Sequence, residues 1–152
     1  MTDVLSREQR RFNMSRIRGS NTKPEVLVRS ALHALGFRFR LHDRRLPGTP
    51  DIVLRRHRAV IFVNGCFWHG HGCKYSKMPN TRAEFWRQKI SRTKARDTAA
   101  IEQLLNLGWN VIVVWECSLR GRDQVARNSA WTSIRTALAK RHPTISEVVP
   151  LH

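Results

Sequence analysis

The chain has 152 residues, enough for one domain with its own hydrophobic core. Its hydrophobic fraction of 41% is that of an ordinary folded protein and excludes wholesale disorder. The 28 Lys and Arg residues outnumber the 11 Asp and Glu residues, which gives a formal net charge of +17. This excess favours a polyanionic partner, because cations near phosphates release condensed counterions. The sequence shows no signal-peptide pattern and no apolar run of about 18 residues, so we expect a cytoplasmic protein with no membrane partner.

The distribution of charged and apolar residues divides the chain into three segments. Residues 1–21 are predicted to be a basic N-terminal arm that binds DNA, in which Met14 and Ile17 offer an apolar face. A solvated basic tail docked on the domain explains this arm equally well. Residues 22–140 are predicted to form the folded domain, and residues 141–152 a loose C-terminal tail.

The first predicted helix begins after Thr22, a favourable N-cap, and ends at Gly36. Glu25 lies in its first turn, where compensation of the helix dipole is enough to explain an acidic residue. The apolar stripe predicted to face the core comprises Val26, Leu27, Ala31, Leu32 and Leu35. Residues 37–41 then alternate between apolar and basic side chains, which indicates a strand.

A turn rich in Pro and Gly precedes Asp51, which opens a predicted strand over residues 51–54. Residues 59–63 are predicted to be the second strand of an antiparallel hairpin. The start of one strand and the end of its antiparallel partner coincide, so Asp51 should share a sheet edge with the segment that begins at Asn64. A turn-capping role is the alternative interpretation of Asp51.

In the second half of the chain, Thr81 and Glu84 have the spacing of a capping box and predict the start of a long helix that ends at Gly108. The apolar run over residues 109–117 is typical of a strand buried on both faces. A strand, a helix and a buried strand in this order indicate a parallel crossover. A last helix is predicted over residues 131–138. The predicted fold class is therefore α/β, with a mixed central sheet flanked by helices.

Cysteine and histidine are concentrated in the Gly-rich segment 64–73. An odd number of cysteines without an export signal favours metal binding or free thiols over disulfides. Cys66, Cys73 and Cys117 would complete a tetrahedral zinc site if His69 or His71 supplied the fourth ligand. The alternative is three reduced core cysteines, which fits Cys117 better than the two cysteines of the Gly-rich segment.

The histidine that zinc would leave free is a natural general base close to Asp51. A carboxylate would orient that histidine, and Asp97 is a candidate. Asp51 is a natural ligand for Mg²⁺. With the basic charge, these features point to metal-assisted hydrolysis of a nucleic-acid phosphodiester. Phe67 and Trp68 suit stacking on bases, whereas Trp86 is better explained as a core residue.

These motifs resemble those of the very-short-patch repair (Vsr) endonucleases, and the resemblance covers residues 13–121. The blocks Gly65-Cys66-Phe67-Trp68-His69 and Trp115-Glu116-Cys117 are its most specific part. The other matching blocks are Asn13-Met14-x-x-Ile17, Pro47-Gly48-x-Pro50-Asp51, His71-x-Cys73, Thr81-Arg82-x-Glu84-Phe85-Trp86 and Leu107-Gly108-Trp109. The resemblance implies a fold like that of type II restriction endonucleases, with residues 22–140 as the endonuclease domain.

The implied activity is a Mg²⁺-dependent nick 5′ to the T of a T:G mismatch, the product of 5-methylcytosine deamination. By this resemblance Asp51 would bind Mg²⁺, His69 would be the general base, Asp97 would orient it, and Glu25 would hold a water of the metal. A structural Zn²⁺ would be held by Cys66, His71, Cys73 and Cys117. Intercalation beside the mismatch would fall to Phe67, Trp68 and Trp86, with Met14 entering from the opposite groove.

One branch of the family has Thr-His where this chain has Val63-Asn64. Any residue at position 63 supplies a backbone carbonyl, so Val63 can still face Mg²⁺. Asn64 removes a second possible acid or base, which puts the rate, the metal preference or the handling of the leaving group in question.

The implied partners are double-stranded DNA with a T:G mismatch, mismatch-repair proteins and a cytosine-5 methyltransferase system. Because a single-strand nick needs one active site, we expect a monomer. Two other hypotheses stay open. One is a zinc-containing module that binds distorted DNA without cutting it, and the other is a restriction-type nuclease that cuts a perfect duplex.

Overall fold

A five-stranded mixed sheet forms the centre of the computed structural model, which describes residues 6–9, 21–120 and 124–150. In spatial order its strands are β1 (Arg40–Leu41), β2 (Ile52–Leu54), β3 (Ala59–Asn64), β4 (Asn110–Trp115) and β5 (Ile145–Val148). The first three strands pair antiparallel, whereas β3, β4 and β5 pair parallel. The hairpin and the parallel crossover predicted from the sequence are both confirmed.

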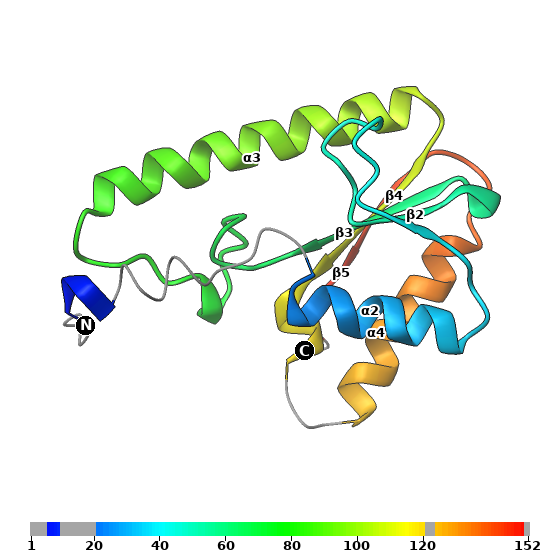
Figure 1. Cartoon of the computed structure of the whole chain (residues 1–152), viewed down its shortest axis with the longest axis horizontal. Helices are drawn as coiled ribbons and strands as arrows, with labels where there is room; N and C mark the ends of the chain where they lie inside the picture. The colour runs from blue at the N-terminus through cyan, green and yellow to red at the C-terminus, as the bar shows by residue number, and fades with distance from the viewer. Residues whose placement is uncertain (1–5, 10–20, 121–123, 151–152) are drawn as a thin grey trace.

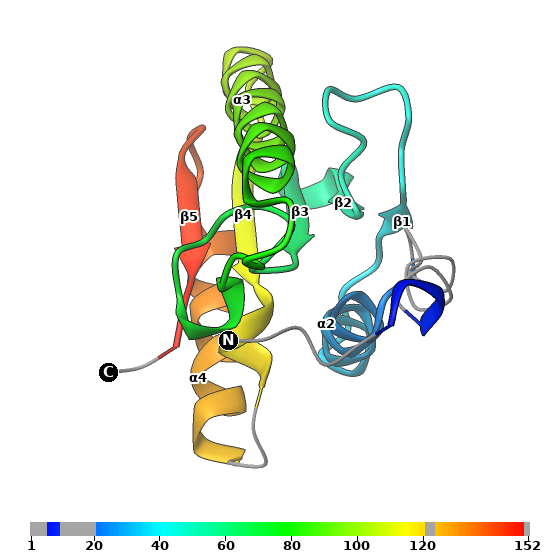
Figure 2. The ribbon, with the colours of Figure 1, turned by 90° about the vertical axis from the view of Figure 1, so that its left-hand side faces the viewer.

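Helices cover both faces of the sheet (Figures 1 and 2). The helices that flank the sheet are α2 (Lys23–Ala34), α3 (Ala83–Asn106) and α4 (Gln124–Leu138), and short 3₁₀ turns occupy Arg55–His57, Lys74–Ser76 and Glu116–Leu119. One face packs against α2 and α4 and the other against α3. The prediction of an α/β protein with a mixed sheet flanked by helices is confirmed, and the likeness to restriction endonucleases stays a prediction.

The two faces of β3 build two separate cores. Ile61 and Val63 pack with residues of α2 and α4, while Val60 packs with Leu104 of α3 on the opposite face. This alternation follows from the two-residue period of a strand. Because β3 and β4 are covered on both sides, their residues are nearly all apolar and buried, as expected for the parallel part of a sheet.

Helix α2 begins as predicted, with the Thr22 hydroxyl accepting a hydrogen bond of 3.4 Å from the Glu25 backbone N–H. The apolar stripe predicted for it is confirmed at Leu32 but is wrong for most of its other members. Its buried positions are Glu25, Val28 and Leu32. Three members of the predicted stripe are 39%, 38% and 47% exposed, namely Val26, Leu27 and Leu35. The helix is therefore rotated so that Glu25 points inward, toward the end of the sheet where β3 finishes.

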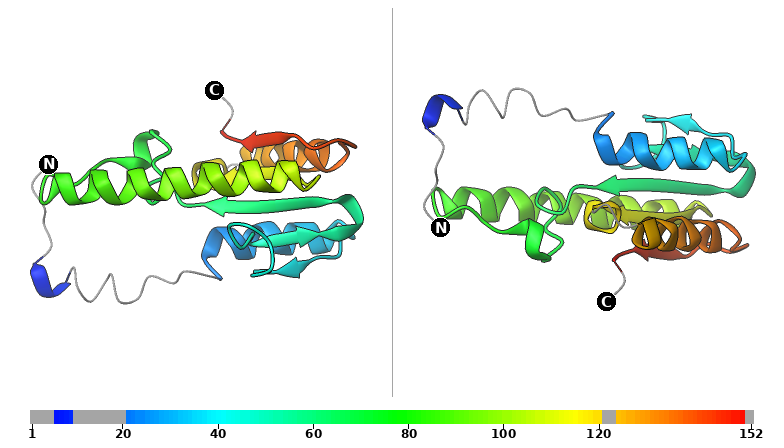
Figure 3. Two further views of the ribbon diagram at one scale, coloured as in Figure 1. Left: turned by 90° about the horizontal axis from the view of Figure 1, so that it is seen from above. Right: turned by 90° about the horizontal axis from the view of Figure 1, so that it is seen from below.

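Helix α3 begins with Ala83 after Arg82, which adopts a left-handed conformation with φ 56° and makes no side-chain cap. The predicted capping box is therefore wrong. The Glu84 side chain instead faces its own helix, where it accepts a hydrogen bond of 3.3 Å from the Gln88 amide. The helix runs past the carboxyl end of β3, so that its first turns lie beyond the sheet (Figure 3). This overhang places the beginning of α3 beside the Gly-rich segment.

The C-terminal region differs from the prediction in two ways. Helix α4 begins at Gln124, well before the predicted start at residue 131. The expected loose tail over residues 141–152 is wrong for Ile145–Val148, which form β5 and pair parallel with β4. Val148 is only 1% exposed. The segment was misread because four residues at a sheet edge give too short a pattern to distinguish from a polar tail.

Most of the predicted arm, including Met14, lies outside the described residues. Within the described part of the chain, no helix combines the length and the apolar character that crossing a membrane requires.

Val148→Ala should lower the unfolding free energy by about 1–3 kcal/mol, because it removes buried methyl groups and leaves a cavity in the core between the sheet and α4. Urea unfolding measures this change. The matched control is Val149→Ala, since the neighbouring side chain is 44% exposed and should change stability by less than about 0.5 kcal/mol. Equal effects of the two substitutions would show that residues 145–148 are not part of the sheet.

Candidate active site and metal-ligating cluster

Asp51 lies at the end of the sheet where β3 finishes. In the antiparallel pair Ile52 is opposite Ile61, so the residue before Ile52 lies beside the last residues of β3. The Asp51 carboxylate accepts a hydrogen bond of 2.8 Å from the Val63 backbone N–H. In a strand the N–H and C=O of one residue point to the same side, so the Val63 carbonyl is on the Asp51 side as well. The predicted shared edge is confirmed.

A cleft of about 1180 Å³ opens at this edge of the sheet. It is bounded by the start of α2, the segment 42–51, the end of β3 and the exposed side of α3. Among its lining residues are all four candidate catalytic side chains, Glu25, Asp51, His69 and Asp97, together with the cations Arg44, Lys89 and Arg96. The tertiary fold thus brings these four predicted residues, which are spread over 73 positions of the sequence, into one site.

His69 forms a close pair with Asp97 across the cleft. The His69 Nδ1 atom lies 2.6 Å from Asp97 Oδ2, and both side chains are about two-thirds or more covered. An ionised carboxylate can only accept a hydrogen bond, so Nδ1 is the donor and Nε2 is left as the basic nitrogen. Asp97 comes from the middle of α3, which fixes its position far more firmly than a loop would.

Glu25, Asp51 and His42 form a compact group beside this pair. The His42 Nε2 atom lies 3.0 Å from Glu25 Oε2 and 4.0 Å from Asp51 Oδ1. Glu25 is 4% exposed and also accepts a hydrogen bond of 3.0 Å from the Asn21 backbone N–H. The residue pattern explained Glu25 by the helix dipole, the family resemblance placed it on a water of the metal, and neither identified His42. The signal for His42 is its position at the end of the strand that pairs with β2, opposite Asp51.

The environment of Asp51 favours its neutral form when no cation is bound. Burial raises the pKa of Asp51 to about 6 from 3.8, and the charge of Glu25 acts in the same direction. The hydrogen bond from Val63 and the nearby His42 and His69 oppose this rise only in part. A buried carboxylate short of positive partners is a group that a cation would satisfy.

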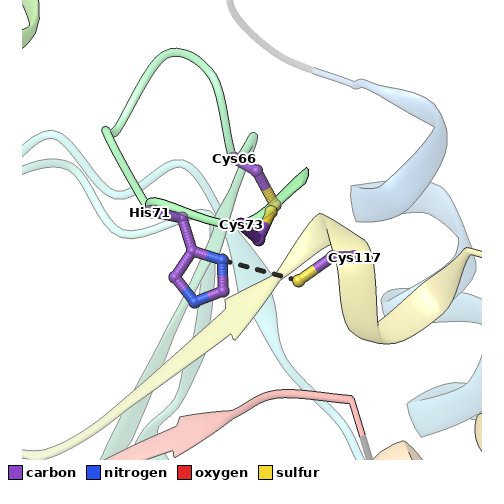
Figure 4. A group of neighbouring side chains, drawn as sticks. All are labelled: Cys66, His71, Cys73 and Cys117. Carbon is purple, nitrogen blue, oxygen red and sulfur yellow. Dashed lines mark hydrogen bonds between the residues drawn. The ribbon is translucent and has the colours of Figure 1, made fainter. Parts of the chain in front are cut away.

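Four thiol and imidazole side chains meet on the other side of the Gly-rich segment (Figure 4). Their ligand atoms all lie within 4.8 Å of one another, and they are the four predicted residues Cys66, His71, Cys73 and Cys117. The parallel register explains the meeting: Asn64 is opposite Trp115, so Cys66 and Cys117 each lie two residues beyond that pair. His71 packs flat on Trp115, with ring centroids 4.1 Å apart, which fixes the imidazole.

The donor set of this cluster fits a tetrahedral divalent metal. Zinc–sulfur bonds of about 2.3 Å place sulfurs about 3.8 Å apart, which is compatible with the observed cluster. Burial raises the pKa of Cys66, and burial with the neighbouring thiols raises the pKa of Cys117 to about 12. Burial also acts to raise that of Cys73, but hydrogen bonds from Tyr75 and His71 prevail and lower its pKa to about 6. A bound metal would stabilise the thiolate forms of Cys66 and Cys117, whose raised pKa values otherwise keep them protonated.

Three aromatic rings form a cluster beside the cleft, and one of them, Trp68, lines it. Phe67 lies 5.0 Å from Trp68 and 5.3 Å from Trp86, measured between ring centroids, and all three side chains are partly buried. Lys89 lies over both indole rings at 5.6 Å from each centroid. Trp86 is therefore a member of a partly exposed aromatic cluster and not of the central core, contrary to the first interpretation from residue type.

A carboxylate-paired histidine and buried acids in one cleft are features of a phosphodiester hydrolase. Residues 2–75 match the family described as DNA mismatch endonuclease Vsr. The chain is 53% identical over 119 residues to the type II nicking enzyme V.XorIIP of Xanthomonas oryzae pv. oryzae, an alignment that covers 78% of this chain and 88% of that protein.

The chain is also 46% identical over 125 residues to the DNA mismatch endonuclease Vsr of Escherichia coli (strain K12), covering 82% of this chain and 80% of that protein. It is 44% identical over 122 residues to the type II nicking enzyme V.NmeAIP of Neisseria meningitidis, covering 80% and 87%. The chain therefore belongs to the DNA mismatch endonuclease Vsr family, as its motifs predicted, and so to the DNA endonucleases.

Asp51→Asn should stabilise the protein at neutral pH when no divalent cation is added. The native pKa of Asp51 lies above its value of 3.8, so the native state holds this proton more tightly than the unfolded state does, and stability falls as pH rises from about 4 to 6. Asparagine is neutral throughout. The variant should therefore gain up to about 3 kcal/mol over wild type at pH 7–8, and the gain should shrink toward pH 4.

Urea unfolding of both proteins at several pH values measures this difference. Glu102→Gln, a substitution of an exposed acid on α3, is the control and should show no comparable gain. A difference between Asp51→Asn and wild type that does not change with pH would contradict the raised pKa.

Proposed function

We propose that this endonuclease nicks one DNA strand 5′ to the T of a T:G mismatch, the lesion left by deamination of 5-methylcytosine. Its activity would serve very-short-patch repair. Family membership supports a DNA endonuclease, and the printed names of its relatives describe nicking and mismatch enzymes. The observation that carries the proposal for this chain is one cleft that holds both the His69–Asp97 pair and Asp51, bordered by a partly exposed aromatic cluster.

In the proposed reaction His69 is the general base. Its Nε2 atom takes a proton from the attacking water, while Asp97 holds Nδ1–H and so maintains the productive tautomer. The imidazolium formed in this way lies beside the Asp97 carboxylate, which stabilises it. The proton acceptor and its orienting carboxylate are thus supplied by two elements that are firmly packed, the Gly-rich segment and α3.

Asp51 and the backbone carbonyl of Val63 would hold the proposed Mg²⁺, because both are oxygen donors on the same side of β3. When bound there, Mg²⁺ supplies Lewis-acid stabilisation of the charge that develops on the scissile phosphate. Glu25 would accept a hydrogen bond from water at the same site. The raised pKa of Asp51 in the cation-free protein supports this assignment, since a cation at this carboxylate would stabilise its charged form.

Phe67, Trp68 and Trp86 would insert beside the mismatch. Insertion unstacks the bases at a cost of a few kcal/mol, which is smallest at a mispair, so the aromatic cluster gives a physical basis for selectivity. Lys89, which lies over both indole rings, would meet the phosphate backbone near the inserted rings. The basic arm over residues 1–21 would complete the clamp, with Met14 entering the opposite groove.

A single cleft with one candidate base fits a monomer that cuts one strand. The proposed partners besides mismatched DNA are mismatch-repair proteins and a cytosine-5 methyltransferase system. The meeting of four thiol and imidazole ligand atoms within 4.8 Å of one another supports a structural Zn²⁺, which would leave no open position for substrate. Its ligands would be Cys66, His71, Cys73 and Cys117. A relationship of the sheet to that of type II restriction endonucleases belongs to the same proposal.

The proposed function is tested with a labelled duplex that carries one T:G mismatch in several methyltransferase-site contexts, incubated with and without Mg²⁺. Wild type should nick beside the T only when Mg²⁺ is present. Asp51→Asn should reduce the rate by at least about 10²-fold, because it removes the anionic metal ligand. His69→Ala should reduce it by about 10²–10⁴-fold, because it removes the base.

The matched duplex with T:A in place of T:G is the essential control, and Glu102→Gln is the control variant. Because Asp51→Asn is expected to be more stable than wild type at neutral pH, misfolding would not explain its loss of activity. Equal cutting of the T:A duplex would favour a restriction-type nuclease. Tight binding of the mismatch without cutting in any context would favour a module that only binds distorted DNA.

The zinc assignment is tested by metal analysis and thermal unfolding. The purified protein should contain about one Zn²⁺ per chain, and His71→Ala should lose it together with about 3 kcal/mol or more of unfolding free energy. The control is His142→Ala, in which an exposed histidine is removed. A zinc content that is unchanged in His71→Ala would contradict the assignment.

A further inference from the structure

Glu25, His42 and Asp51 come from three different elements and converge on one point. Glu25 belongs to α2, His42 follows β1, and Asp51 precedes β2. The backbone fixes the last two opposite each other, because the His42 N–H donates a hydrogen bond of 3.1 Å to the Asp51 carbonyl. The three side chains offer two carboxylates and one imidazole nitrogen, and their ligand atoms all lie within 4.8 Å of one another.

The spacing of these atoms allows one cation to be bound directly by His42 and Asp51, with Glu25 holding a water of that cation as proposed above. Metal–ligand bonds of about 2.1 Å place neighbouring ligands about 3 Å apart and opposite ligands about 4.2 Å apart. The 4.0 Å from His42 Nε2 to Asp51 Oδ1 lies within this range, and Glu25 Oε2, 3.0 Å from the same nitrogen, is close enough to accept a hydrogen bond from water on the cation. Two carboxylates and one histidine also leave a net negative charge in a partly buried site, which a dication would compensate.

The imidazole changes which cation this site prefers. Carboxylate and carbonyl oxygens suit Mg²⁺, whereas an imidazole nitrogen shifts preference toward first-row transition metals, whose affinity for nitrogen ligands is greater. We propose that His42 is a ligand of the active-site cation and that it makes this site select a transition-metal dication, of which Mn²⁺ is the probe, over Mg²⁺. This inference rests on the cation site proposed above at Asp51.

The competing interpretation is that His42 is a protonated partner of Glu25 and lies beside the cation site without contributing to it. The two interpretations predict opposite effects of removing the imidazole. As a ligand, His42 strengthens cation binding, so its loss weakens Mn²⁺ binding. As an imidazolium it repels the cation, so its loss strengthens binding of both Mn²⁺ and Mg²⁺.

The experiment is a Mn²⁺ titration of the full chain, followed by the electron paramagnetic resonance signal of free Mn²⁺, on protein whose zinc content has been measured. Mg²⁺ is then added as a competitor. Wild type should bind Mn²⁺ at least about tenfold more tightly than Mg²⁺. His42→Gln should weaken Mn²⁺ binding about tenfold or more and leave Mg²⁺ binding within about twofold of wild type.

His33→Gln is the matched control, because it removes an exposed histidine from α2, and it should bind both cations as wild type does. Pulsed resonance of the Mn²⁺-loaded wild type gives a second readout, since a coordinated imidazole produces nitrogen coupling. That coupling should disappear in His42→Gln. It identifies the ligand even where the substitution alters the surrounding structure.

Each outcome has one meaning. Failure of wild type to bind either cation, or binding that survives in Asp51→Asn, would overturn the cation site at Asp51 and with it the proposed mechanism. Binding that is lost in Asp51→Asn but unchanged or tighter in His42→Gln would overturn the role of His42 alone and leave the proposed endonuclease site intact.

Discussion

The hydrogen bond between the Asp51 carboxylate and the Val63 N–H joins the architecture of this protein to its chemistry. It ties the residue before β2 to the end of β3 at 2.8 Å, where antiparallel pairing of the two strands has already stopped. The bond uses one carboxylate oxygen and leaves the other facing Glu25 and His42. Because the carboxylate is partly buried there, its charge destabilises the cation-free fold, and the cation proposed for this site would compensate that charge.

Helix α3 contributes to three parts of the molecule, which are the aromatic cluster, the cleft and the core of the sheet. Near its start it supplies Trp86 to the aromatic cluster, in its middle it supplies Asp97 to His69, and near its end Leu104 anchors it in the core of the sheet. A rigid helix therefore fixes the distance between the surface proposed to probe DNA and the proposed base. A change in the packing of Leu104 would therefore displace both Trp86 and Asp97.

The Gly-rich segment lies between the cleft and the cysteine cluster and contributes side chains to both. Alternate residues of the segment point His69 into the cleft and His71 into the cysteine cluster, where it packs on Trp115. A metal held by that cluster would join the ends of β3 and β4 and so hold His69 in position. A cluster placed outside the cleft can stabilise the site without taking part in the reaction.

How much the sequence determined depends on how local each interaction is. The α/β class, the hairpin and the parallel crossover were recognisable from strand and helix periods, which are local properties. Residue types and spacing indicated the three cysteine ligands and Asp97 as a partner of the free histidine, but they left His69 and His71 as alternatives. Only the family resemblance assigned His71 to the cluster and His69 to Asp97. The inward rotation of α2, the strand β5 and the position of His42 were not recognisable in this way. Each of these depends on which surface is buried by a partner distant in sequence. Glu25 faces inward because Asp51 and His42 lie opposite it. Val148 is buried because β5 pairs with the edge of β4. Those choices are made by tertiary packing, which residue patterns alone do not encode.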